Sequence, residues 1–555
     1  MITRECFLEA ILDKVPRLIG LLNRNTSSSN YGCFDRDFWH YNIVDFACAR
    51  KQEATLTLSL IYLINNKKNM YYRSEEILEY IRAALNFWPK IQNKKGCFNE
   101  WYPNESSFVA TAFSTYAISE SMLLIGYLLS EPEKKNVLKA LIKAGEWLQN
   151  RNEIRVINQQ TGAAVALYNL YMLTSNNIFL KASKDKISVL KQKQSSEGWF
   201  EEYGGPDIGY LSLSIDYLVK YYLKSNNEEA KEIINCSIDF IKNFIQPNLK
   251  VGGEYTSRNT EYLIPHGFEA FSAFTDDARF IACVNRETAS DRNSFPNIFD
   301  DRYLTYTGYT WLQSYMDANI ELDEKTEIII NAHFKQPFTR YFNASGLFVV
   351  NDSNMHLIIN LKKGGSFRLF DKRGDKLHSD SGILVKSYGK WYTSGWLIEY
   401  QHNGINNTME ISGNLVQVPD KVLSPIKNIL LRLFQLTFGY SVIVSRYLKE
   451  ILRNFLITKP KYSKIRYKRT IHLCFSTNKL VEVKNYVYAE NDCISAISIG
   501  TRDTHIYVPS SRYYVGIREK PFQKFFNPPI SQYQNNCCIK SCTESVYEEV
   551  SHGYI

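Results

Sequence analysis

The sequence has 555 residues, of which 45% are hydrophobic and 22% are charged. This composition is that of an ordinary globular protein, and the length predicts two or three domains. The net charge is +9, but residues 421–470 hold twelve lysines and arginines against one acid, so the remaining residues sum to 9 − 11 = −2. Because one segment carries the positive charge, the composition argues against a nucleic-acid-binding protein.

The cysteines and the N-terminal segment predict a cytoplasmic protein. The 11 cysteines are scattered without a CxxC pair, as is usual in a reducing compartment. Residues 1–22 place acids within an apolar pattern, which predicts an amphipathic helix and not a signal peptide.

The first 325 or so residues have a helical pattern. Apolar residues recur at spacings of three and four, and short loops rich in Asn, Gly, Pro or Ser separate the segments. The clearest predicted helices are 51–64, 74–88, 107–129, 134–150, 161–174 and 208–224. Such helices, joined by short connections, stack as a bundle, a solenoid or a ring.

An internal repeat favours the ring. GCFNEWYPNESSF (96–108) aligns without gaps with GWFEEYGGPDIGY (198–210), and GCFDRDFWHY (32–41) is a weaker third copy. Each clear copy precedes a long predicted helix, and repeated units of this kind bury their faces against their neighbours. The loops would then gather at one end of the ring and line a cleft. The alternative is that their glycines and aromatic residues only fix the turns.

From about residue 335 the apolar period changes to two. The predicted strands are 347–350, 355–361, 366–370, 382–388, 472–477, 480–489 and 505–510. Helices followed by strands indicate two domains. We therefore expect a helical toroid at 1–330 and an antiparallel β-sandwich at 331–555.

The basic segment 421–470 interrupts the strands. Its longest uncharged run, Leu433–Ser445, has 13 residues, which is too short to cross a bilayer. One interpretation is an interfacial helix that docks on an anionic membrane, which would make the protein a peripheral membrane protein. The other is an insertion packed against the sandwich.

Three motifs resemble those of the heparinase II/III-like proteins. The first, NQQTGAAVALYNLYML (158–173), resembles the polar start of an inner helix of the family. The second, EGWFEEYGGPDIGY (197–210), resembles the family's stretch that leads to a tyrosine. The third, HSDSGILVKSYGKWYTSG (378–395), resembles the motif that opens the family's sandwich. The order agrees over most of residues 30–400. The resemblance implies a toroid followed by a sandwich, and a lyase that cleaves uronate-containing glycan by β-elimination. Its partner would be an acidic polysaccharide or a lipid-linked glycan.

This chemistry requires a group that neutralises the uronate carboxylate and a base that removes the C5 proton. The resemblance implies that Asn158 and Gln159 are the neutralising groups and that Tyr210 is the base and acid, with Tyr203 as its substitute. The alternative for Asn158 is a helix N-cap, and that for Tyr210 is a buried aromatic residue.

The densest polar stretch is GGEYTSRNTEYLIPHGFE (252–269). Arg258 is suited to bidentate pairing with a substrate carboxylate, and His266 is a candidate proton carrier. Asn259 and Glu269 are further candidate substrate contacts. The alternative is a loop that satisfies its own polar groups.

His378 is a candidate substrate contact from the sandwich. Zinc is the one cofactor left open, because His378 and Asp380 would need a third ligand. His356 and His402 are the nearest other histidines in the sequence.

The sequence departs from the family at Gln159 and Gln160, where the family has a histidine or a second asparagine. Glutamine donates hydrogen bonds but carries no proton, so two other functions stay open. One is a glycoside hydrolase, which needs two facing carboxyls, drawn from Glu100, Glu105, Glu202 and Asp207 of the repeated loops. The other is a non-catalytic, membrane-associated glycan-binding protein. A cytoplasmic location would suit the biosynthesis of surface polysaccharide.

Overall fold

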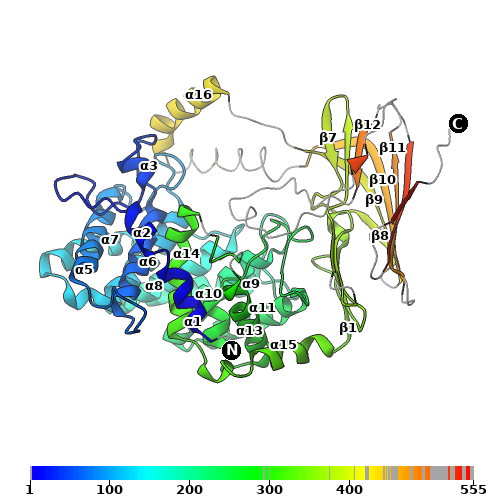
Figure 1. Ribbon diagram of the computed structural model, residues 1–555. Coiled ribbons are helices and arrows are strands. Elements are labelled where there is room, and N and C mark those ends of the chain that lie inside the picture. The colour runs from blue at the N-terminus through cyan, green and yellow to red at the C-terminus, as the bar shows by residue number, and fades with distance from the viewer. Residues whose placement is uncertain are drawn as a thin grey trace.

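The computed structural model places a ring of helices beside two β-sheets (Figure 1). It describes residues 3–418, apart from 292–293, 299, 374–375 and 405–406. It also describes 424–441, 444, 447, 451, 460–474, 479–489 and 494–499, and the strands at 523–524, 532–540 and 546–549.

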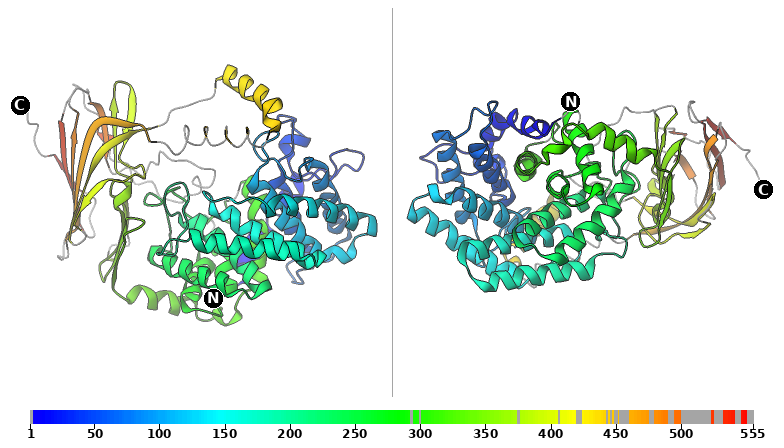
Figure 2. Two further views of the ribbon diagram at one scale, coloured as in Figure 1. Left: turned by 180° about the vertical axis from the view of Figure 1, so that it is seen from behind. Right: turned by 90° about the horizontal axis from the view of Figure 1, so that it is seen from below.

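The helical part is an α/α toroid, as the sequence predicts. Each inner helix contacts the next, and the last contacts the first, which closes the ring (Figure 2). Within the described residues the inner helices are α4 (Ala54–Leu63), α6 (Phe108–Ile125), α8 (Ile157–Thr174), α10 (Ile208–Ser225), α12 (His266–Phe271) and α14 (Asp301–Met316). The outer layer is formed by α5 (Glu75–Phe87), α7 (Glu131–Gln149), α9 (Asn177–Lys193), α11 (Glu228–Ile241) and α13 (Asp276–Ser290), with α1 (Glu5–Leu12) contacting α13.

The inner and outer helices differ in where their apolar residues lie. The inner helix α6 is buried on nearly all sides, whereas the outer helix α5 buries one face and begins at the N-cap Ser74. By length and composition, Phe108–Leu128 is the one candidate membrane span among the described residues, and 78% of its apolar window is buried inside the protein. Its apolar character is explained by its place in the inner ring.

The repeated loops share the backbone conformation of their first glycine. Gly32, Gly96 and Gly198 have φ of +92°, +90° and +95°, a region open mainly to glycine. A Cβ at each of them would lie within 2.3 Å of an outer-helix carbonyl oxygen, that of Ala83, Lys143 or Cys236 respectively. Gln92 and Gln194 donate in the same way to the carbonyls of Gly96 and Gly198. The weak copy at 32–41 therefore matches the two clear copies at its glycine.

The second part is a pair of packed antiparallel sheets. The first is a meander of β1 (Phe338–Phe342), β2 (Leu347–Asn351), β3 (Met355–Asn360), β4 (Ser366–Asp371) and β5 (Lys376–Asp380). The second has the order β13-β12-β6-β7-β9-β10-β11-β14-β15, with β8 paired to β9. Its strands are β6 (Ile383–Ser387), β7 (Lys390–Thr393), β8 (Gln401–Asn403), β9 (Thr408–Gln417), β10 (Tyr462–Leu473), β11 (Lys479–Tyr488), β12 (Ile494–Ile499), β13 (Gln523–Lys524), β14 (Gln532–Lys540) and β15 (Val546–Glu549).

The first sheet joins the two parts because both of its faces are buried. Phe348 and Leu357 point into the sandwich core, whereas Val349 and Ile358 belong to the helical core. Strands covered on both faces are continuously apolar, as observed for β2 and β3. The change from helix to strand falls between Lys335, where α15 (Thr326–Lys335) ends, and the start of β1.

Two segments differ in form from the sequence prediction. The single helix predicted at 1–22 is two helices, α1 and α2 (Val15–Leu21), because Pro16 occupies the first turn of α2, where proline is tolerated. The segment 421–470 contains α16 (Pro425–Leu436), and its last residues form β10 inside the second sheet. The strand predicted at 505–510 lies outside the described residues.

Candidate functional site

The N-terminal ends of α8 and α10 are tied together by Glu202. Its Oε1 accepts hydrogen bonds from the backbone N of Asn158 at 3.3 Å and from Asn158 Nδ2 at 2.9 Å. Glu202 is 1% exposed, and burial raises its pKa to about 8. Asn158 is therefore held by a protein carboxyl, and Gln159, half-buried beside it, is the more accessible of the two predicted neutralising groups.

Asp207 fixes the position of Tyr210 relative to Arg258. As the N-cap of α10 it accepts from the backbone N of Tyr210 at 3.2 Å. It also accepts from the backbone N of Arg258 at 3.0 Å and from Thr256 Oγ1 at 3.0 Å. Asp207 also accepts from Thr260. Protein donors thus occupy the Asp207 carboxylate, which positions the two loops.

Arg258 lies buried against Tyr203 and near Tyr210. Its side chain stacks on Tyr203, with Cζ 3.6 Å from the ring centroid. It interacts electrostatically with Tyr203 and Tyr210 and, less strongly, with Asp207 and Glu202. Arg258 is 4% exposed, and its Nε and Nη2 have no hydrogen-bond acceptor within the described structure. Burial lowers the pKa of the guanidinium.

The other buried arginines of the described residues are paired with carboxylates. Arg286 contacts Glu269 at 2.8 Å, Arg368 contacts Glu254 at 2.6 Å, and Arg469 contacts Asp380 at 3.0 Å. Among the described residues, no carboxylate lies within ion-pair distance of the Arg258 guanidinium. A buried cation is costly unless an anion neutralises it, so this guanidinium is suited to binding a carboxylate from outside the protein.

Two residues of the sandwich, Lys363 and Arg368, bind the loop that carries Arg258. Lys363 Nζ, from the turn after β3, donates to the Thr256 carbonyl at 2.6 Å and to Asn259 Oδ1 at 2.5 Å. Burial lowers the pKa of Lys363 to about 7. Arg368, from β4, binds both Glu254 and Glu261. The predicted substrate contact Asn259 is thus held by a lysine that the sequence did not single out.

His266 and Glu269 lie in a different polar network, inside the ring. His266 Nδ1 is 2.9 Å from Asp216 Oδ1, and Nε2 is 2.9 Å from Asp317 Oδ2. Burial lowers the pKa of His266, but these two hydrogen bonds outweigh burial and leave it raised. Glu269 is fully buried against Arg286. Both side chains fix α12 to its neighbours and are not gathered with Arg258.

Two other predicted site residues are also engaged within the protein. Glu105 accepts from the backbone N of Glu100 at 3.0 Å and of Trp101 at 2.8 Å, so it holds its own loop. His378 is 6% exposed on β5. Two residues further along the strand, Asp380 binds Arg469 on β10 and ties the two sheets together.

The histidines considered for zinc have separate partners. His356 Nδ1 lies 3.2 Å from Asn351 Oδ1, and His402 Nε2 lies 3.3 Å from the Tyr341 hydroxyl. Within the described residues no group of three or more His, Cys, Asp or Glu side chains has a geometry that would hold a metal ion.

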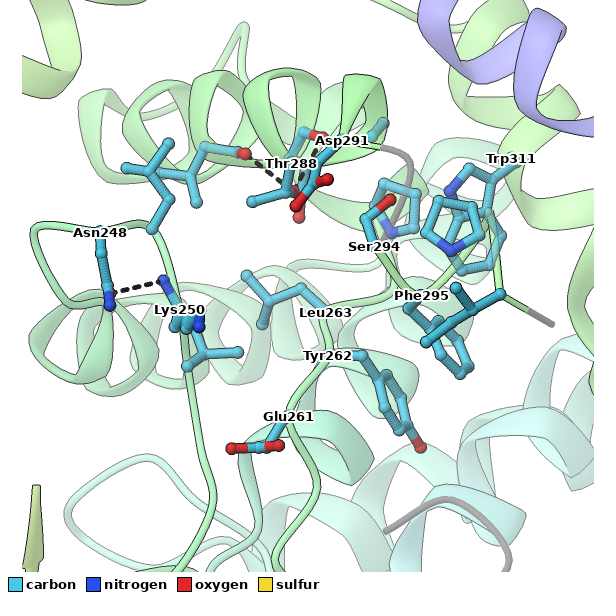
Figure 3. Close-up of a pocket in the computed structure, with 18 residues that line it drawn as sticks. Asn248, Lys250, Glu261, Tyr262, Leu263, Thr288, Asp291, Ser294, Phe295 and Trp311 are labelled. Carbon is cyan, nitrogen blue, oxygen red and sulfur yellow. Dashed lines mark hydrogen bonds between the residues drawn. The ribbon is translucent and has the colours of Figure 1, made fainter. Parts of the chain in front are cut away.

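A cavity of about 130 Å³ lies next to the loop 248–263 (Figure 3). Tyr262 and Phe295 stack at its wall with their ring centroids 4.2 Å apart, and Trp311 lies nearby. Its described lining includes none of the predicted site residues, so the arginine–tyrosine cluster is a separate feature.

The fold resembles those of several solved glycan-degrading enzymes. A chondroitin AC lyase from Streptomyces coelicolor is 8% identical with a TM-score of 0.48, over 89% of this chain and 68% of the lyase. A heparan sulfate lyase from Pedobacter heparinus is 9% identical with a TM-score of 0.40, over 90% and 70%. A GH127 β-L-arabinofuranosidase from Geobacillus stearothermophilus is 9% identical with a TM-score of 0.36, over 97% and 96%. The sequence matches no protein-family model and no curated protein. These likenesses assign neither a reaction nor a residue.

The structure thus brings together Tyr203, Tyr210 and Arg258, next to the Asn158–Glu202 pair. No sequence signal distinguished Lys363, which stands in an ordinary Lys-Gly-Gly turn. The capping role of Asp207 had a partial signal, because aspartate directly before an apolar helix is a common N-cap.

Proposed function

We propose that the protein is a glycan-active enzyme that cleaves a uronate-containing polysaccharide by β-elimination. The observation that carries the proposal is the buried Arg258 guanidinium, which has two nitrogen atoms without acceptors among the described residues and stacks on Tyr203 near Tyr210. A planar guanidinium matches a carboxylate in bidentate geometry. The substrate class is therefore an acidic glycan.

In the proposed reaction Arg258 neutralises the uronate carboxylate, which makes the adjacent C5 proton more acidic. The Tyr210 oxygen, as phenolate, removes this proton, the C4–O bond breaks, and a double bond forms between C4 and C5. The leaving sugar oxygen takes up a proton, which the Tyr210 phenol can return. No external oxidant or metal is needed to balance the step.

The assignment of roles follows from what holds each side chain. Tyr203 has its ring covered by Arg258, so its proposed role is to support the guanidinium. Tyr210 is half-buried in the first turn of α10, and its backbone is fixed by the carboxylate that also fixes Arg258. Gln159 is a candidate second donor to the substrate carboxylate, since Asn158 already donates to Glu202.

The test is the ultraviolet absorbance of the unsaturated uronate during incubation with a panel of acidic polysaccharides. We expect the absorbance to rise with the unmodified protein and not with Tyr210→Phe, which keeps the ring but removes the hydroxyl. Tyr127→Phe is the matched control, because Tyr127 is 68% exposed on a separate turn. Absorbance that rises equally with Tyr210→Phe would refute the assignment of the base.

A glycoside hydrolase is the second candidate, and one observation favours it. Glu202 has a pKa raised to about 8 and an Oε2 without a donor or acceptor among the described residues, as a general acid requires. Hydrolysis also needs an ionised partner carboxylate, and the nearby Asp207 is engaged by protein donors. Shortened polysaccharide chains without new absorbance would favour the hydrolase. If the protein neither shortens the chains nor raises the absorbance, a glycan-binding protein is favoured.

The cellular role we propose is in the biosynthesis of surface polysaccharide. It rests on the expected cytoplasmic location, where an acidic polysaccharide or lipid-linked glycan under construction would be the substrate.

A further inference from the structure

The helix α16 carries its apolar residues on the side that faces away from the protein. Large apolar side chains recur along one face and are exposed by 71% at Ile426, 60% at Ile429, 61% at Leu430, 56% at Leu433 and 46% at Leu436. Phe438, just after the helix, is 68% exposed. Contiguous apolar surface of this kind is uncommon on a soluble monomer and marks an interaction site.

The opposite face of α16 is the one that contacts the toroid. Gln435 is 5% exposed, and its carbonyl accepts from Asn104 Nδ2 at 3.2 Å. Arg432 forms an ion pair with Asp45. Figures 1 and 2 show α16 against the N-terminal part of the ring, close to α3 (Arg36–Trp39). The polar contacts therefore orient the helix with its apolar face outward.

The loop that supplies Asp45 extends the exposed apolar surface. Tyr41, Ile43 and Val44 are 55%, 74% and 37% exposed. Two segments far apart in the sequence thus present apolar side chains at the same end of the molecule. The other contact of α16, through Asn104, is made with the first clear repeat loop, one of the loops at the N-terminal ends of the inner helices.

The charge of the segment identifies the partner. Residues 421–459, which precede β10, contain seven lysines and arginines and one acid. The helix α16 itself has Lys427 and Arg432 with no acidic residue, and Arg432 is paired with Asp45. An apolar helix face combined with a basic segment is the pattern of a helix that lies in the interface of an anionic bilayer. A protein partner would explain the apolar face but not the excess of positive charge.

We propose that α16 and the 41–44 loop dock the protein on the surface of an anionic phospholipid membrane. The apolar side chains enter the boundary between headgroups and acyl chains, and basic residues of 421–459 such as the exposed Lys427 bind the lipid phosphates. The toroid loops around Asn104 then face the membrane, where a lipid-linked glycan would be presented. The docking itself does not depend on the proposed lyase reaction.

Vesicle co-sedimentation tests the docking. The full-length protein is mixed with vesicles of equal parts phosphatidylglycerol and phosphatidylcholine, or of phosphatidylcholine alone. We expect binding to the anionic vesicles only, weakened in about 0.5 M salt, where the Debye length falls to about 4 Å. The double variant Ile429→Glu/Leu433→Glu should lower the partition coefficient at least about tenfold.

Ile328→Glu is the matched control, because Ile328 is 71% exposed on α15, away from α16. It should bind the vesicles as the unmodified protein does. The proposal is overturned if the protein does not bind anionic vesicles, or if the double variant binds as well as the control. It is also overturned if the unmodified protein forms dimers that the double variant does not, since the face would then bind a second copy. Polysaccharide cleavage in solution, measured separately, would not be affected by any of these outcomes.

Discussion

Replacing Arg258 by methionine should stabilise the protein while it abolishes activity. Each buried N–H without an acceptor costs roughly 1–3 kcal/mol, and Arg258 has such groups at Nε and Nη2. The cation–π stack of Arg258 on Tyr203 offsets this cost by about 0.5–2 kcal/mol. Methionine keeps most of the apolar stem and carries no charge. We therefore expect the free energy of unfolding of Arg258→Met to rise by about 1–4 kcal/mol.

The same substitution removes the proposed donors to a substrate carboxylate. A hydrogen bond to a charged group contributes about 1.5–3 kcal/mol, so the loss of two should lower kcat/KM at least about 100-fold. Urea unfolding and the absorbance assay measure the two effects. The control is Arg286→Met, which leaves Glu269 buried without its partner and should destabilise by about 3–5 kcal/mol. If Arg258→Met destabilises as much as this control, the guanidinium is structural and the proposed site is wrong.

Three further substitutions test other parts of the structure. Folded Glu202 keeps its proton up to about pH 8, whereas the unfolded side chain loses it near pH 4.3. The free energy of unfolding should therefore fall by up to about 1.4 kcal/mol per pH unit between these values. The Glu202→Gln variant should lack this slope in urea titrations. Folded Lys363 loses its proton near pH 7, and the unfolded side chain loses it near pH 10.4. The free energy of unfolding should therefore rise with pH over this range by a similar slope, which Lys363→Met should lack. If either variant has the same pH profile of stability as the unmodified protein, the pKa assigned to that residue is wrong. Gly198→Ala should destabilise the protein by at least about 2 kcal/mol because of the positive φ of Gly198 and the nearby carbonyl. Gly20→Ala is the control, since no atom lies within 4 Å of the added Cβ, and it should be neutral or stabilising. Thermal unfolding measures both effects.

The ring and the sandwich could be predicted because their signals are local. The inner helices are bounded by loops whose glycines repeat at 32, 96 and 198, and these glycines meet the same steric demand in three places. The strands around Phe348 were evident as short apolar runs. β9 was missed, because its residues alternate imperfectly and include a glycine.

The candidate site could be predicted only in part, because its chemistry depends on which partners meet in space. Asn158 and Glu202 were both expected to face the substrate, and they bind each other instead. Arg258 stood out because it lies in the densest polar stretch, but the sequence could not show that its guanidinium, unlike that of Arg286, forms no ion pair among the described residues. The carboxylate partners of the buried Arg286, Arg368 and Arg469 lie 17, 114 and 89 residues away in the sequence, so no spacing rule reveals them.

The position of Arg258 depends in turn on Asp207, and this dependence gives a final prediction. The Asp207 carboxylate accepts the backbone N–H groups of Tyr210 and Arg258 and the Thr256 hydroxyl. Asp207→Asn keeps the shape but offers an NH2 group to some of these donors, so kcat should fall and KM should rise while the far-ultraviolet dichroism stays unchanged. If Asp207 acts by placing Arg258, the kcat/KM losses of Asp207→Asn and Arg258→Met should not add in the double variant. Fully additive losses would show that Asp207 affects activity by another route, such as the first turn of α10 and Tyr210.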